Sequence, residues 1–160
     1  MRPNMNRKIL LLLLAALPAT ALAQHHHEAH APAAADAAPA AAQPAEGQRW
    51  ATDANLREGM GRIRSTVDEL RHHEMGHMGD ERAALLATGI TRDIGWIVAN
   101  CELAPEADAA LHPIIGRLAA DASALKANPG DTTPIASMRD ALADYARLFD
   151  DPGNAAASGD

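Results

Sequence analysis

The segment Leu70–Asp80, L-R-H-H-E-M-G-H-M-G-D, concentrates side chains that can bind a metal. It contains three of the chain's eight histidines together with one glutamate and two methionines. Imidazole and carboxylate groups are ligands for divalent transition metals, whereas thioether sulfur favours Cu(I). The first functional hypothesis is therefore a metal site, with copper as the leading ion and zinc or nickel as alternatives.

The spacing of these residues suggests how one ion would be held. If a helix runs through the segment, His73 and His77 lie four residues apart on one face, so both imidazoles can coordinate the same ion. Glu74 is a candidate third ligand, and Met78 lies nearby on the same projection. The alternative is that a helix end is exposed, needs no apolar stripe, and simply carries solvated polar residues.

The residues His73–His77 also spell H-E-x-x-H, the helical signature of zinc proteases. A small helical domain has no sheet to form a substrate cleft, and the glycines at positions 76 and 79 would fray the helix. No nucleophile with a neighbouring base and no phosphate-binding glycine loop is visible. We therefore expect a protein that is not an enzyme.

A second candidate set consists of Cys101, His112 and Met60, whose sulfur and nitrogen donors suit Cu(I). Each has a simpler interpretation. A single cysteine on an apolar stripe commonly acts as a small hydrophobic residue, Met60 occupies a core position, and His112 stands just before Pro113, where a helix can start.

A third candidate lies near the N-terminus, in Gln24–His30, Q-H-H-H-E-A-H, with histidines at His25, His26, His27 and His30. Cleavage after Ala23 would leave a free amine on Gln24 and place His26 third. In that arrangement an amine, two amides and an imidazole enclose Cu(II) or Ni(II) in a square plane. The alternative is a spacer with incidental histidines.

Residues 1–23 resemble a secretory signal peptide. A basic start precedes the apolar run Ile9–Leu17, and small residues stand at Ala21 and Ala23. We expect export, with the periplasm of a Gram-negative bacterium as the destination. Removing this leader leaves 11 basic residues against 21 acidic ones, a net charge of −10. Such a chain is a poor partner for nucleic acid or anionic membranes and a better one for cations.

The rest of the chain divides by composition. Residues 24–49 are mainly Ala, Pro and His with no apolar period, which predicts a disordered tail. Residues 50–151 show four apolar stripes of helical period, and residues 152–160 are expected to be a second disordered tail. Short connections make successive helices antiparallel, so the sequence predicts an all-α, up-down-up-down four-helix bundle.

Cap and breaker residues set the expected helix boundaries. Asp53, Asp80 and Thr133 are expected to cap the first, second and fourth helices. The third helix is expected to break near Pro113. The stripes read Leu56, Met60, Ile63, Val67, Leu70; then Leu86, Ile90, Ile94, Ile97, Cys101; then Leu111, Ile115, Leu118, Ala122, Leu125; and finally Ile135, Met138, Leu142, Tyr145, Phe149.

This topology separates the candidate sites. Positions equally far from the turn at Gly79 should lie side by side, which places Cys101 level with Arg57 and close to Met60. The Leu70–Asp80 segment then lies at the opposite end, about 30 Å away at about 1.5 Å per helical residue. One metal centre cannot use both sets.

The Leu56-x-x-x-Met60 pattern and the domain length resemble the periplasmic bundles of the cytochrome b562 and cytochrome c-prime type. That resemblance implies the bundle fold but no haem, since there is no C-x-x-C-H motif and the stretch Ile135–Phe149 has no histidine to pair with Met60. The histidine-rich segment Gln24–His30, at the start of the chain left after export, is similar to those of exported bacterial copper-resistance proteins.

Two functions remain. The first is binding, sequestration or delivery of copper in the periplasm. The second is an acidic helical adaptor or chaperone-like module whose periplasmic protein partner packs on a face of the bundle and whose histidines matter little.

Overall fold

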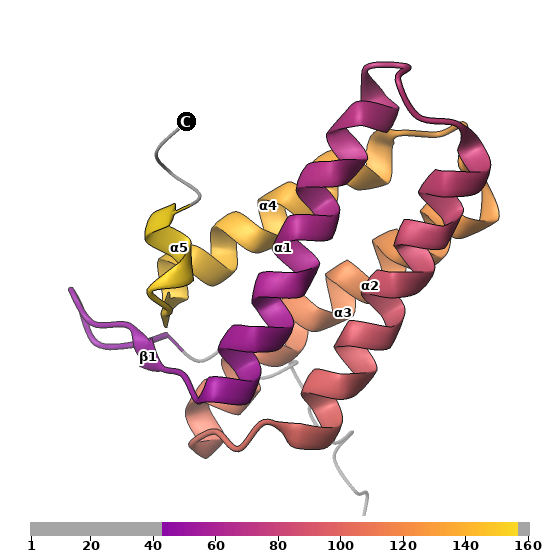
Figure 1. Ribbon diagram of the computed structural model, residues 1–160. Coiled ribbons are helices and arrows are strands. Elements are labelled where there is room, and N and C mark those ends of the chain that lie inside the picture. The colour runs from indigo at the N-terminus through magenta and orange to yellow at the C-terminus, as the bar shows by residue number, and fades with distance from the viewer. Residues whose placement is uncertain (1–42, 157–160) are drawn as a thin grey trace, which may run out of the picture. The chain divides into compact units, whose positions relative to one another are not determined.

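The computed structural model describes residues 43–156, which form four long helices joined by connections of four or five residues. These are α1 (Ala54–Glu74), α2 (Asp80–Asn100), α3 (Pro105–Ala127) and α4 (Thr133–Leu148). Successive helices pack against one another and α4 closes back on α1, with α1 and α2 running side by side in Figure 1. The antiparallel up-down-up-down bundle predicted from the sequence is confirmed.

Two very short strands join the ends of this domain. β1 (Trp50–Ala51) and β2 (Phe149–Asp150) pair in parallel, with Trp50 opposite Phe149. The sequence did not predict them, because two residues are too few to show the alternation of a strand. The segment expected to be a disordered tail from Pro152 begins instead with the one-turn helix α5 (Gly153–Ala156).

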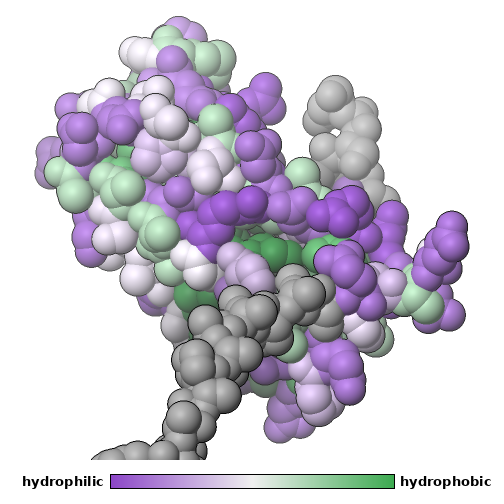
Figure 2. All heavy atoms as spheres, turned by 180° about the vertical axis from the view of Figure 1, so that it is seen from behind, coloured by the Kyte–Doolittle hydropathy of each residue, from purple (hydrophilic) through white to green (hydrophobic). Residues whose placement is uncertain are grey.

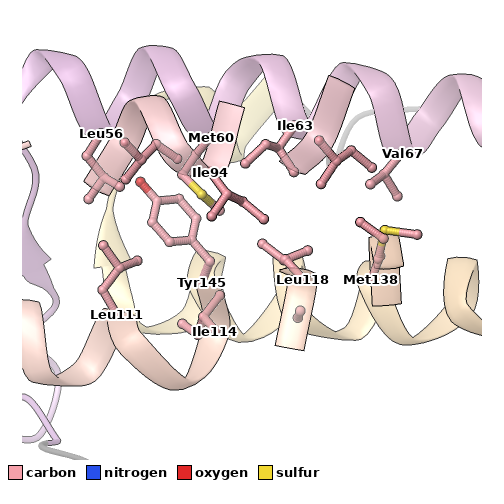
Figure 3. Close-up of a cluster of buried hydrophobic side chains, with 14 of the residues drawn as sticks. Leu56, Met60, Ile63, Val67, Ile94, Leu111, Ile114, Leu118, Met138 and Tyr145 are labelled. Carbon is pink, nitrogen blue, oxygen red and sulfur yellow. The ribbon is translucent and has the colours of Figure 1, made fainter. Parts of the chain in front are cut away.

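The apolar face of α1 faces the centre of the bundle. All five residues of its expected stripe are fully buried: Leu56, Met60, Ile63, Val67 and Leu70. Figure 3 shows the first four of these residues facing Leu118 of α3 and Met138 of α4 across the core. On α2, Ala83 and Ala87 are fully buried whereas the expected Leu86 is only half-buried. Small side chains at these core positions let the helices approach closely.

Of the three residues expected to cap helices, only Asp53 does so, at the start of α1. Asp53 Oδ1 accepts a hydrogen bond from the Leu56 amide at 2.6 Å, and its Oδ2 accepts one from the Glu102 amide at 2.6 Å. Asp80 is the first residue of α2 and does not cap it, because Gly79 occupies the cap position. At α4 the cap position is Thr132 instead of Thr133, and Asp131 Oδ1 accepts the Thr133 amide at 3.0 Å.

The expected break at Pro113 is wrong, because α3 runs without interruption from Pro105 to Ala127. A proline inside a helix costs about 3 kcal/mol through a lost hydrogen bond and a steric clash. Leu111 before it and Ile114 after it are both buried on the same face of α3. Burial on both sides of the proline therefore offsets the local cost and keeps the helix continuous.

Polar residues cover much of the face shown in Figure 2, with hydrophobic residues scattered among them. Within residues 43–156, none of the helices combines the length and apolar character needed to cross a membrane.

A glycine sets the distance between α1 and α2. A Cβ built on Gly59 would overlap Ile97 Cγ1 and lie 2.8 Å from Ile97 Cδ1. Gly59 is itself buried, and Ile97 is 1% exposed, so the isoleucine side chain has little room to move. On the same helix, a Cβ on Gly61 would meet nothing within 4 Å.

We predict that Gly59→Ala lowers the free energy of unfolding by about 1–3 kcal/mol, the usual cost of overpacking a core. Gly61→Ala is the matched control and should raise it by about 0.5–1 kcal/mol, because alanine is the better helix former. Urea denaturation of both variants measures the difference. Equal stabilities of the two variants would contradict the close contact between α1 and α2.

Candidate metal-binding sites

The end of α1 divides the first set of candidate metal ligands, which comprises His73, Glu74, His77 and Met78. The helix stops at Glu74, and Gly76 adopts a φ of +74°. The amides of Gly76 and His77 then donate to the carbonyls of His73 and His72 at 2.9 and 2.8 Å, a Schellman motif. His77 and Met78 therefore do not continue the helical face, and the expectation that His73 and His77 share that face is wrong.

His73 is buried, with 7% of its surface exposed, and both of its ring nitrogens contact backbone carbonyls. Nδ1 lies 2.8 Å from the Met78 oxygen and Nε2 lies 2.6 Å from the Pro129 oxygen. Since carbonyl oxygens only accept, each nitrogen must carry a proton to make its bond. In this arrangement neither nitrogen has a lone pair for a metal, and the imidazole instead links α1 to the turns that precede α2 and α4.

These contacts favour the charged imidazolium. The bond to the Pro129 carbonyl and then the bond to the Met78 carbonyl raise the pKa of His73, and burial only partly opposes them. Asp80, whose Oδ1 lies 3.9 Å from Nε2, adds a smaller effect in the same direction.

Glu74, the third member of this set, is engaged by α4. Its two carboxylate oxygens accept from the two terminal nitrogens of Arg139, one of them at 3.1 Å, and this pairing raises the pKa of Arg139. A bidentate contact of this kind fixes the carboxylate and neutralises its charge. His77 is exposed, whereas Met78 is half-buried against the core, so the structure does not gather these four residues.

The second candidate set is partly brought together. Cys101, the C-cap residue of α2, and His112 of α3 line one surface pocket of about 240 Å³. Met60 does not line it, because its side chain is fully buried in the core. The pocket is lined by Ile97, Val98, Cys101, Asp108, Leu111, His112 and Ile115.

Asp108 orients the imidazole of His112. His112 Nδ1 donates to the backbone carbonyl of Asp108 at 2.8 Å, and the Asp108 carboxylate oxygen Oδ2 lies 3.6 Å from the same nitrogen. A proton on Nδ1 leaves the lone pair of the neutral ring on Nε2. Asp108 was not among the candidate residues from the sequence, although its i,i+4 spacing to His112 is a signal for this contact.

The Cys101 thiol is half-buried beside these groups. Burial raises its pKa, and the negative charges of Asp53 and Asp108 raise it further. A metal that binds this sulfur must therefore displace a proton.

Within residues 43–156, the structure has no group of three or more His, Cys, Asp or Glu side chains able to hold a metal ion. The histidines of the tail, His25, His26, His27 and His30, lie outside the described residues, as does the leader 1–23. Their metal binding remains a prediction.

We predict that His73 stabilises the fold in a pH-dependent way. Because the folded-state pKa is raised above its unfolded value, the stabilisation is fully present below the unfolded pKa of about 6.5 and is lost as the pH rises through the folded-state value. The loss of stability in His73→Gln, measured by urea denaturation, should be larger at about pH 5.5 than at about pH 9. The exposed His72→Gln is the control, and a pH-independent loss in His73→Gln would contradict the charged bridge.

Comparison of the chain with protein-family models, curated proteins and solved structures finds no match.

Proposed function

We propose that this chain is an exported protein that binds copper and sequesters or delivers it in the periplasm. The observation that carries the proposal is the pocket that Cys101 and His112 both line. Two chain segments supply them, the cap residue that follows α2 and the first half of α3, and both belong to the folded domain. The proposed export rests on the leader-like residues 1–23.

The chemistry of the donors supports copper. Thiolate sulfur and imidazole nitrogen are both ligands that copper accepts, and thiolate selects the reduced ion. The bond from His112 Nδ1 to a backbone carbonyl is the outer-shell arrangement that metal-binding histidines commonly have, since it fixes the ring and leaves Nε2 to the metal.

The net charge of the mature chain, −10 after removal of the leader, raises the local concentration of cations. The histidines of the tail would form a second, weaker binding region that collects the ion before it reaches the folded domain. Copper held by one cysteine and one histidine at the surface remains accessible, which suits a protein that passes the ion on.

Titration of the purified chain from Gln24 onward tests this function. Under anaerobic, reducing conditions, Cu(I) in competition with a chelator should bind with a Kd below about 1 μM. Cys101→Ser should weaken Cu(I) binding, whereas deletion of residues 24–30 should remove binding of Cu(II) or Ni(II). If neither Cu(I), Cu(II), Zn(II) nor Ni(II) binds below about 1 μM, the copper function is wrong and the adaptor function is favoured.

A further inference from the structure

The walls of the pocket supply few metal ligands. Only three of its seven lining residues, Cys101, Asp108 and His112, carry side-chain atoms that bind metals. The other four are aliphatic: Ile97, Val98, Leu111 and Ile115. No other side chain that lines the pocket could therefore complete a coordination shell.

Asp108 lies at the Nδ1 edge of the His112 ring, so it is not placed to bind a metal ion that Nε2 holds. Its carbonyl and its carboxylate both face Nδ1, at 2.8 and 3.6 Å. The two nitrogens of an imidazole point in diverging directions, so a metal on Nε2 lies across the ring from that carboxylate. The protein donors available to one ion in this arrangement are therefore Cys101 Sγ and His112 Nε2.

A site with only two donor atoms, one of them a thiolate sulfur, favours some metal ions over others. Zn(II) at structural sites takes four ligands in a tetrahedron, and Cu(II) and Ni(II) prefer a square plane of nitrogen and oxygen atoms. Cu(I) has a filled d shell, favours soft sulfur ligands and is stable with two donors in line.

We infer that the pocket between α2 and α3 is a two-donor site selective for Cu(I), with Cys101 Sγ and His112 Nε2 as its ligands and the Asp108 carboxylate outside the coordination shell. This inference rests on the proposed copper function and specifies the oxidation state and ligands of one site. On binding, the Cu–S bond forms as the Cys101 S–H proton passes to solvent, and copper enters and stays as Cu(I), so no electron is transferred.

The test uses the mature chain in which the four tail histidines, His25, His26, His27 and His30, are replaced by alanine. Anaerobic titration with Cu(I) against a competing chelator should give one ion per chain, and X-ray absorption should show one sulfur and one nitrogen neighbour. In this background, Cys101→Ser and His112→Ala should each lower the Cu(I) affinity by at least about tenfold.

Asp108→Asn is the discriminating variant, because it keeps the backbone carbonyl that holds Nδ1 and removes only the carboxylate charge. Cu(I) affinity should change by less than about threefold, well below the loss of a direct ligand. His72→Ala, an exposed histidine at the other end of the bundle, is the control for general surface binding, and circular dichroism confirms that each variant folds.

The outcomes separate the inference from the function on which it rests. If the chain with its tail intact binds no copper, both are wrong. If that chain binds copper but the tail-substituted chain does not, the copper function stands through the tail and the pocket site is wrong. A large loss in Asp108→Asn, or binding of Zn(II) as tight as that of Cu(I) in the tail-substituted chain, would also overturn the two-donor Cu(I) site.

Discussion

Burial of one apolar face of α1 is the constraint on which the rest of this structure depends. Its five stripe residues are fully buried, and the four labelled in Figure 3 face side chains from the other long helices. At Gly59 the absence of a side chain lets Ile97 of α2 pack directly against the α1 backbone. Since burial is the dominant favourable contribution to folding, this face sets where the other three helices can lie.

The ends of α1 are held by polar contacts that reach other parts of the chain. At its start, the Asp53 carboxylate caps the helix with one oxygen and holds the Glu102 amide of the α2–α3 connection with the other. At its end, His73 contacts the carbonyls of Met78 and Pro129. Backbone groups in turns lack the partners that a helix provides, and these two side chains supply partners for three of them.

A dense cluster of ligand-type residues does not by itself present free donor atoms to a metal. His73 and Glu74 have the same chemistry as metal ligands, but a pair of carbonyls and Arg139 already occupy their polar atoms. Cys101 and His112 are less conspicuous in the sequence, yet they share a pocket, and Nε2 of His112 faces no hydrogen-bond partner within residues 43–156. The two sets differ in whether their donor atoms already make hydrogen bonds or ion pairs within the protein. They do not differ mainly in how many donor atoms they contain.

The sequence by itself determined the four helices, their antiparallel order, the buried face of α1 and the cap at Asp53, because helical period, short connections and local capping depend on residues close together in the chain. The same reasoning placed the Leu70–Asp80 segment and Cys101 at opposite ends of the bundle. It failed at His77, where the positive φ of Gly76 turns the chain away from the helical face, and at Pro113, where packing outweighs a local penalty.

Only the tertiary structure decided which polar atoms meet. The bond between His73 and the Pro129 carbonyl spans 56 residues, and β1 pairs with a strand at the far end of the domain. The shared pocket of Cys101 and His112 and the exclusion of Met60 from it likewise depend on how α2 and α3 rotate about their axes. Such contacts are set by the packing of whole helices, so no local pattern of residue types encodes them.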